Sequence, residues 1–388
     1  MKVCIIGSGI SGLYAGLLLK NNKHDITIFE KNKIIGGRIK NRTFDGDRVV
    51  AGAGIGRKSD TLLQKLCNDL NVPTRDFQSK SLYYGGITPE FTPLDKIKYI
   101  GDYMRQNPQF ENQTFKEAAS SILGKMEYKK LISYVGETDF EDEDAYDAVT
   151  IYGFDKSFSS GFPAFSIDWD AFLQAFDKLL GEHIKLNTKV DTIHRINDQY
   201  EVNGQMFDAI IIATTINQTK NLLSTLLPPK KLLLYDNIAC QPFARVYAKL
   251  DSPLDDLQGY RALITKNPFQ KIIEMNRDKC IYMISYSDNC PALFWLKKKH
   301  HLCRTIEKQL LTKLGISRKV LKSRLCFWNC GTHYFKPLPK PFRARQNFLL
   351  KVIHPEPNVY AVGEAFSLNQ GWCEGALESV QSMIHYLR

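Results

Sequence analysis

The sequence of 388 residues has no run of eighteen apolar residues, no internal repeat and no low-complexity segment. The missing apolar run excludes a membrane-spanning helix, because about 20 such residues are needed to cross the hydrocarbon core. A predicted strand begins at residue 2 and leaves no room for a signal peptide, so we expect a soluble, intracellular protein of the cytoplasm. No nucleic-acid-binding motif accompanies the net charge of +11, so we assign no nucleic-acid partner.

The nine cysteines form an odd set and lack the paired spacing of a zinc site. We therefore expect no bound metal. Thiols stay reduced in a chain without a secretory leader, so we interpret most of these cysteines as small core residues. The oligomeric state is left open by the sequence.

The first thirty residues combine two strand-like segments with a glycine-rich turn and a helical pattern. Gly7, Gly9 and Gly12 follow the apolar segment Val3–Ile6, and Glu30 follows a second apolar segment. In this arrangement the first glycine allows a tight turn, the second lets a pyrophosphate approach, and the third lets the helix pack on the sheet. The start of the helix offers free N–H groups to the phosphates. Glu30 would bind two ribose hydroxyls and repel a 2′-phosphate, which indicates a dinucleotide other than NADP.

The segment after Glu30 contains Gly36, Gly37 and Arg38, and here the sequence resembles the flavin-containing amine oxidase superfamily. In that family the glycine pair and the arginine lie beside the pyrophosphate and ribityl chain of FAD. A planar, permanently charged guanidinium suits a diphosphate. The resemblance therefore implies that FAD is the cofactor, with Gly37 and Arg38 among its ligands.

The C-terminal segment resembles the same family, in Val-Gly363-Glu364 and in Gly-Trp-Cys-Glu-Gly375-Ala376. The resemblance implies that Glu364 binds the ribityl hydroxyls. It also implies that the helix start at Gly375 and Ala376 points its amides at the N1/C2=O edge of the flavin, where they stabilise the reduced state. Between the two ends of the chain, the backbone of Val190 is expected to contact the adenine.

The family's fold class is α/β, with an FAD-binding Rossmann-like domain of the glutathione-reductase type. An α+β substrate domain that contains a mixed sheet is interleaved with it. We expect residues 1–80, 181–230 and 345–388 to form the FAD-binding domain, and residues 81–180 and 231–344 the substrate-binding domain. A length of 388 residues with 44% apolar content suits two domains.

Aromatic side chains often form two walls of the substrate site in this family, perpendicular to the flavin. Trp372 occupies one of those positions in the sequence, and Tyr334 or Phe335 is the nearest choice for the facing wall. Gly331, which follows Cys330, departs from the pattern and puts the second wall in doubt.

Many members also have a lysine that reaches flavin N5 through a water molecule. By its order along the chain Lys279 fits this role, and Lys271 and Arg245 are the alternatives. His333 is a further choice for substrate contact. Some monoamine oxidases attach FAD through a cysteine in a segment comparable to that of Cys330, so a covalent link is left open.

These residues predict an FAD-dependent oxidase that takes a hydride from an amine, delivers it to flavin N5 and returns the electrons to O₂, giving H₂O₂. The substrate is a small primary amine, a polyamine, an amino acid or an N-methylated side chain. Two alternatives stay open. One is a related desaturase or protoporphyrinogen-type oxidase, and the other is a flavin-bound binding or structural protein with little turnover. The C-terminal motif disfavours a galactopyranose mutase, which would share the N-terminal one.

Overall fold

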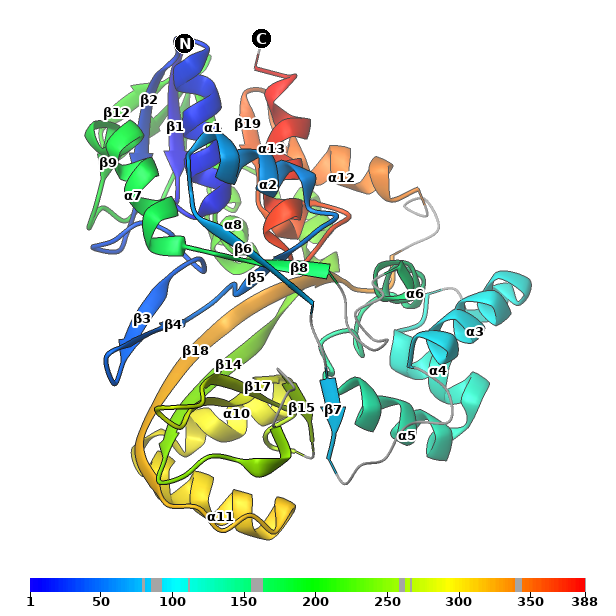
Figure 1. The fold of residues 1–388 in the computed structure, drawn as a ribbon. Helices are drawn as coiled ribbons and strands as arrows, with labels where there is room; N and C mark the ends of the chain where they lie inside the picture. The colour runs from blue at the N-terminus through cyan, green and yellow to red at the C-terminus, as the bar shows by residue number, and fades with distance from the viewer. Residues whose placement is uncertain are drawn as a thin grey trace.

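The computed structural model describes residues 1–78, 81–84, 93–110, 112–154, 163–257, 262–265, 267–338 and 344–387. A parallel five-stranded sheet lies at the top of Figure 1, next to both chain termini. The apolar runs of its central strands are buried, as is usual for parallel sheets with both faces covered. The strand order is β19 (Val359–Ala361), β13 (Ala209–Ile212), β1 (Lys2–Ile6), β2 (Asp25–Phe29) and β9 (Ile184–Lys185).

Helices from three distant parts of the chain pack beside this sheet. Helix α1 (Ile10–Asn21) contacts α7 (Trp169–Leu180) and the C-terminal α13 (Cys373–Ile384). Helix α1 packs closely on the sheet because residue 16 is glycine. A Cβ on Gly16 would lie 2.9 Å from the side chain of Ile28. Helices α2 (Thr61–Asp69), α8 (Ile216–Leu223), α9 (Pro229–Leu232) and α12 (Arg345–Ile353) complete this part.

A second, six-stranded sheet occupies the bottom of Figure 1. Its pairs are antiparallel, apart from the parallel pair of β15 with β7, so the sheet is mixed. Strands β14 and β18 are long enough to run from this sheet toward the first one (Figure 1). The strand order is β18 (Val320–Phe335), β14 (Ile238–Leu250), β17 (Ile281–Asp288), β16 (Lys271–Asn276), β15 (Ala262–Ile264) and β7 (Ser81–Tyr83).

Helices cover the second sheet and extend beside it. Helices α10 (Asn289–Lys297) and α11 (Leu302–Leu314) share its core, in which Trp295 and Ile306 are fully buried. Four more helices form a cluster with a core of its own, at the right of Figure 1. They are α3 (Pro93–Gln106), α4 (Phe115–Leu123), α5 (Lys125–Val135) and α6 (Ala145–Phe154).

Short strands connect the two parts. The hairpin β3–β4 and the small sheet β5–β8–β6 lie between the main sheets, and the sheet β10–β11–β12 flanks the first one. Their bounds are β3 (Asn41–Phe44), β4 (Asp47–Val50), β5 (Ile55–Arg57), β6 (Thr74–Gln78), β8 (Pro163–Ile167), β10 (His194–Ile196), β11 (Gln199–Val202) and β12 (Gln205–Phe207). The 3₁₀ helices are η1 (Pro108–Phe110), η3 (Gly181–His183), η4 (Leu233–Asn237), η5 (Asp255–Leu257), η6 (Lys299–His301) and η8 (Glu364–Phe366).

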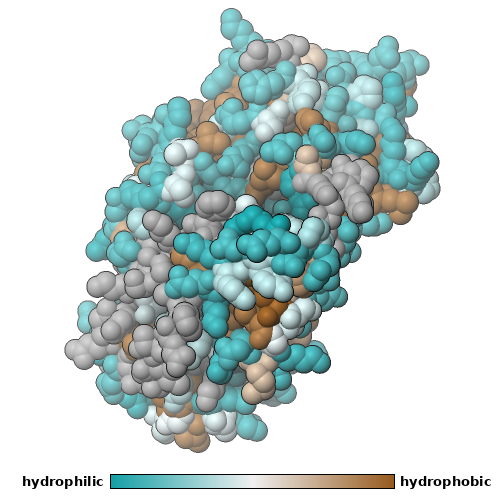
Figure 2. Space-filling model, turned by 90° about the vertical axis from the view of Figure 1, so that its right-hand side faces the viewer, coloured by the Kyte–Doolittle hydropathy of each residue, from teal (hydrophilic) through white to brown (hydrophobic). Residues whose placement is uncertain are grey.

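The predicted fold class is confirmed, because a Rossmann-like parallel sheet is interleaved along the chain with a mixed sheet. Among the residues coloured in Figure 2, hydrophilic ones predominate, and hydrophobic ones occur in small groups. Among the described residues, no helix has both the length and the apolar character needed to cross a membrane.

Candidate active site

A pocket of about 390 Å³ lies at the carboxyl ends of the parallel strands, where open α/β sheets usually bind ligands. Residues from both ends and the middle of the chain line its inner part. These are Gly7, Gly9, Glu30, Gly36, Gly37, Arg38, Val190, Gly363, Glu364, Cys373 and Ala376. The structure thus brings together the predicted cofactor residues except Gly12 and Gly375, which lie behind the lining.

The glycine-rich turn forms the floor of the pocket. Gly7 has φ +104°, and a Cβ on it would lie 2.5 Å from the carbonyl oxygen of Ala213, so the turn requires glycine there. A Cβ on Gly12 would lie 2.0 Å from the carbonyl oxygen of Gly7. Gly9 differs, because a Cβ on it would meet no protein atom within 4 Å. Gly9 is also the N-cap of α1, so the open space borders a helix N-terminus and fits a phosphate group.

Glu30 is held in a fixed orientation at the end of β2. Only 5% of it is exposed. Its carboxylate accepts hydrogen bonds from the backbone N–H and hydroxyl of Ser8, at 3.0 and 2.8 Å, and from the backbone N–H of Asn32 at 2.9 Å. The side-chain amide of Asn32 donates a fourth hydrogen bond at 2.6 Å, so a dinucleotide ribose would take the place of the Ser8 hydroxyl or the Asn32 amide at this carboxylate.

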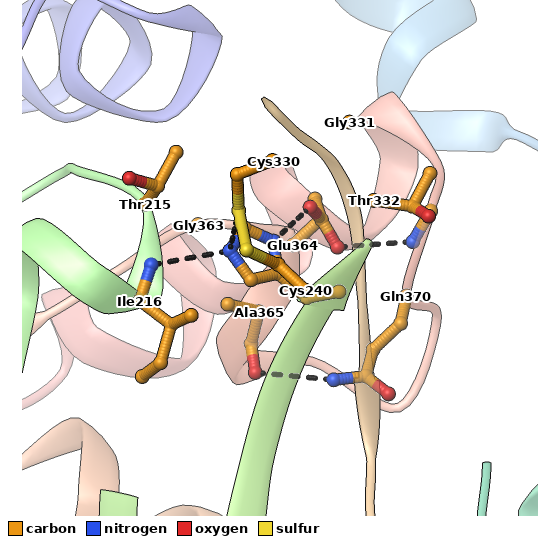
Figure 3. A network of polar contacts seen from close by, with 12 residues as sticks. Thr215, Ile216, Cys240, Cys330, Gly331, Thr332, Gly363, Glu364, Ala365 and Gln370 are labelled. Atoms are coloured by element: carbon orange, nitrogen blue, oxygen red, sulfur yellow. Dashed lines mark hydrogen bonds and ion pairs between the residues drawn. A yellow bond between two sulfur atoms is a disulfide. The ribbon is translucent and has the colours of Figure 1, made fainter. Parts of the chain in front are cut away.

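Glu364 lies at the centre of a polar network (Figure 3). It accepts hydrogen bonds from Arg38 Nη1 at 2.6 Å, from His333 Nδ1 at 2.5 Å and from the backbone N–H of Gly371 at 3.0 Å. Burial alone would raise the pKa of Glu364. The charges of His333 and Arg38 and these hydrogen bonds outweigh burial and lower the pKa to about 2. Glu364 is therefore ionised at neutral pH, and it fixes the Arg38 guanidinium at the pocket wall.

The N-terminus of α13 faces the same pocket. Its N-cap is Trp372, which makes no capping hydrogen bond through its side chain, and Trp372, Cys373 and Ala376 all line the pocket. A Cβ on Gly375 would lie 2.1 Å from the carbonyl oxygen of Asn369, so glycine lets the helix start pack tightly. The positive end of a helix dipole at this point would stabilise negative charge on a bound cofactor.

Aromatic residues surround the outer part of the pocket. Its lining there comprises Phe243, Arg245, Tyr286, Trp328, Thr332 and Trp372. The rings of Phe243 and Tyr286 pack edge to face with centroids 5.6 Å apart. Trp328 donates a hydrogen bond to the carbonyl of Ala51 at 2.6 Å, and the Arg57 guanidinium lies 4.1 Å from the centre of the Trp372 ring. These contacts give the walls a defined position.

The charge in the outer part is positive. The Arg245 guanidinium lies 4.4 Å from the centre of the Tyr286 ring, and no carboxylate within the described ranges forms an ion pair with it. Lys40 lies 4.9 Å from the centre of the Trp328 ring, and burial together with the charge of Arg42 lowers its pKa. The only acids that line the pocket, among the residues that the structure describes, are Glu30 and Glu364 at its inner part.

Several residues proposed from the sequence lie outside the pocket. Tyr334 is not part of the lining, and burial together with the charges of Asp142 and Glu143 raises its pKa. Phe335 is buried against Phe348 instead. Of the three aromatic residues predicted as walls of the substrate site, only Trp372 lines the pocket.

The two lysines predicted to reach flavin N5 also lie outside the pocket. Lys279 lies in the turn between β16 and β17, is about half exposed and forms an ion pair with Asp47. Lys271 pairs with Glu137 close to the Tyr286 ring. Neither lysine lines the pocket, whereas Arg245, the third alternative, does.

The expectation for Cys330 requires a correction, because its sulfur is bonded to Cys240 rather than free. The other seven cysteines are free, as expected. A widened register between β14 and β18, where Gln241 pairs with Thr332 and Phe243 with Trp328, brings Cys330 next to Cys240. His333 is buried and contacts Cys330 and Glu364.

Sequence reasoning missed Phe243, Tyr286 and Trp328, which lie on three neighbouring strands. A side chain at Gly331 would meet the Phe243 ring, since a Cβ there would lie 2.5 Å from the Phe243 Cβ. Phe243 thus fills the place left by the glycine that had put the second wall in doubt.

Comparison with known families gives two matches. A family described as flavin-containing amine oxidoreductase matches residues 106–381, and an NAD(P)-binding Rossmann-like domain matches residues 5–70. Together they span the cofactor pocket and the outer aromatic part.

Among solved structures, the fold is similar to that of putrescine oxidase, including the wild type bound to putrescine. That likeness has a TM-score of 0.79 and 15% identity, and covers 100% of this chain and 99% of the other. Curated relatives match only short stretches. A 4,4′-diapophytoene desaturase of Staphylococcus aureus is 44% identical over 55 residues, which are 14% of this chain and 11% of the desaturase. An uncharacterized protein of Methanocaldococcus jannaschii is 42% identical over 53 residues, 14% of this chain and 13% of that protein.

Proposed function

The chain belongs to the flavin-containing amine oxidoreductase family, and from this premise we propose that it is an FAD-dependent oxidase of a small amine that also carries a carboxylate. In the reaction a hydride leaves the carbon next to the amine, the imine is hydrolysed, and O₂ is reduced to H₂O₂. FAD, when bound, supplies the hydride acceptor and the return of two electrons to O₂. The supporting observation is the aromatic, cationic outer part of the cofactor pocket.

The inner part of the pocket would hold FAD with residues that suit each of its portions. The turn at Gly9 suits the pyrophosphate, Glu30 the adenosine ribose, and Arg38 the diphosphate or the ribityl chain. The N-terminus of α13, at Ala376, suits the edge of the flavin ring on which negative charge gathers after reduction.

Arg245 supports an amine with a carboxylate. A guanidinium without a carboxylate partner among the described residues is a favourable ligand for a carboxylate, which it can bind with two parallel hydrogen bonds. The same charge disfavours a diamine, because two positive charges about 4 Å apart repel each other by about 4 kcal/mol near a protein surface. We therefore propose an amino acid rather than a polyamine as the substrate.

The outer part would also favour the neutral amine that hydride transfer requires. Aromatic walls at Trp372 and Tyr286 desolvate the amine, and the Arg245 charge opposes its protonation, so both lower its pKa. Trp372 and Phe243 would orient the reacting carbon by packing on either side. The proposal gives no step to Tyr334 or Lys279.

A desaturase-like reaction, in which hydride leaves a carbon that bears no amine, is the second candidate. The alignment with 4,4′-diapophytoene desaturase supports it, but covers only 14% of this chain. Substrate charge separates the candidates, because a polyene hydrocarbon has no group for Arg245.

The test compares amino acids with their decarboxylated counterparts, such as ornithine with putrescine, in anaerobic flavin bleaching and in H₂O₂ formation. We expect the amino acid of the best pair to be preferred. Replacement Arg245→Met should lower kcat/KM for that amino acid by about 30-fold to 5,000-fold, since losing one partner of a buried charge pair costs about 2–5 kcal/mol. The decarboxylated amine should lose no activity, and putrescine should gain, because the repulsion by Arg245 is removed.

Lys249→Met is the matched control, because Lys249 lies on the same strand but pairs with Asp45 at 2.6 Å outside the pocket. It should leave the preference unchanged. Equal losses for the amino acid and the simple amine in Arg245→Met would refute the carboxylate assignment. Bleaching by no amine at all would refute the oxidase itself.

A further inference from the structure

We propose that the Cys240–Cys330 disulfide is a redox-active acceptor that takes an electron pair from the reduced flavin, with His333 as the residue that takes up one of the two protons. The disulfide joins the neighbouring strands β14 and β18, with the two Cα atoms 5.2 Å apart. Cys330 lines the cofactor pocket, whereas Cys240 lies behind it. The proposed function supplies the reduced flavin, so the inference depends on it for its source of electrons.

The surroundings of Cys330 are those of a reactive sulfur. Its Sγ lies 3.2 Å from His333 Nε2, and His333 Nδ1 is hydrogen-bonded to the ionised Glu364. A cysteine beside a histidine that a carboxylate orients is the arrangement by which proteins stabilise a thiolate. Figure 3 shows the disulfide between Ile216 and Glu364.

The position of His333 is fixed on three sides. The imidazole is 3% exposed, and Nε2 accepts a hydrogen bond from the backbone N–H of Ile216 at 3.1 Å. Arg38 in turn donates a hydrogen bond to Glu364. A chain of polar contacts therefore connects Arg38 at the pocket wall, through Glu364 and His333, to the sulfur of Cys330. Nε2 is therefore directed at both Cys330 and Ile216. As a hydrogen-bond acceptor it carries no proton, so it can take one up when the S–S bond breaks and then pair, as an imidazolium, with the Cys330 thiolate.

The alternative is a purely structural cross-link. Strands β14 and β18 already pair along almost their whole length, so the bond is not needed to bring them together. Of the nine cysteines, only this pair is oxidised, and it lies at the cofactor pocket.

The step balances in atoms and electrons. Two electrons enter the S–S bond, which breaks. One proton converts Cys240 to a thiol, and the other goes to His333 Nε2, which pairs with the Cys330 thiolate. The same two electrons and two protons are released when reduced FAD returns to its oxidised form.

An anaerobic dithionite titration of the holoprotein tests the proposal without any amine, so it can fail separately from the proposed function. Flavin absorbance is followed, free thiols are trapped with N-ethylmaleimide, and the labelled cysteines are identified by mass spectrometry. The apoprotein receives the same dithionite. We expect Cys240 and Cys330 to be labelled in the holoprotein and not in the apoprotein.

Variants make the result specific. Cys240→Ser and Cys330→Ser should each take up one electron pair less than the wild type, while Cys326→Ser, which removes a free thiol from β18, should match it. Because Cys240 does not line the pocket, its variant should retain FAD even if Cys330→Ser does not. His333→Asn should slow labelling at least tenfold with unchanged FAD content.

Four results would overturn the proposal. They are equal labelling of apoprotein and holoprotein, equal electron uptake by the wild type and Cys240→Ser, thiols that never appear, and variants that change only the melting temperature. A normal labelling rate in His333→Asn would remove His333 from the step.

Discussion

Replacing Gly9 by alanine separates cofactor binding from folding. Gly9 has φ −69° and ψ 178°, which alanine adopts without strain, and its new Cβ would meet no protein atom within 4 Å. The methyl group would instead project into the pocket at the N-terminus of α1, where the pyrophosphate is expected. We therefore expect a folded protein that has lost its cofactor.

Two quantities, the stability of the apoprotein and its affinity for FAD, should change by different amounts. The free energy of unfolding of the apoprotein should change by no more than about 1 kcal/mol, as for a glycine-to-alanine change at a compatible position. The cofactor should lose about two charge-assisted hydrogen bonds to backbone N–H groups, which together contribute about 3–6 kcal/mol. This corresponds to roughly a 150-fold to 25,000-fold weaker Kd for FAD.

Gly12→Ala is the matched comparison, since its Cβ would lie 2.0 Å from the carbonyl oxygen of Gly7. That backbone clash should destabilise the apoprotein by about 1–3 kcal/mol or more. Thermal unfolding of the apoproteins and fluorescence titration with FAD give the two quantities for each variant. An FAD affinity of Gly9→Ala within threefold of the wild type, or equal apoprotein stabilities of the two variants, would refute the assignment of the turn.

Three further predictions follow from the same contacts. Glu30→Ala should abolish retention of FAD through purification, because its carboxylate is buried and preoriented by Ser8, and stoichiometric yellow cofactor in the purified variant would contradict this. Lys279→Met should leave the rates of flavin reduction and reoxidation within about twofold of the wild type, since Lys279 pairs with Asp47 outside the pocket. A slowed reoxidation in stopped-flow absorbance would instead support Lys279 as the lysine that reaches flavin N5. The pKa of Glu364 is lowered to about 2 from a usual value of about 4.5. The stability that this carboxylate contributes is therefore complete above about pH 4.5 and is lost as the pH falls toward 2. Glu364→Gln should flatten this part of the pH dependence of the apoprotein melting temperature, and an unchanged slope would contradict the assignment.

Local motifs were enough to predict the inner part of the pocket. The turn at Gly7, the acid at Glu30 and the glycine at 363 depend on backbone conformation and on residues close in the chain, so their spacing carries the information. The N-terminal and C-terminal segments each line one part of the pocket. Because both segments resemble the same family, the sequence predicted that they lie together. The fold class followed from the same evidence.

The outer part depends on the register of long antiparallel strands, which the sequence does not display. Phe243 and Tyr286 meet across β14 and β17, and Cys330 reaches Cys240 only because the β14–β18 register widens there. Chain order suggested Lys279, but the β16–β17 hairpin carries its turn away from the pocket. Cysteine spacing alone gave no reason to pair residues 90 positions apart.

The most direct test of the account is anaerobic absorption spectroscopy of the purified holoprotein with an amino acid and its decarboxylated amine. The account predicts a bound, oxidised FAD spectrum that the amino acid bleaches faster than the amine, and recovery of the spectrum with H₂O₂ when air is admitted. A flavin spectrum that neither compound bleaches, or a preference for the diamine putrescine over ornithine, would contradict it.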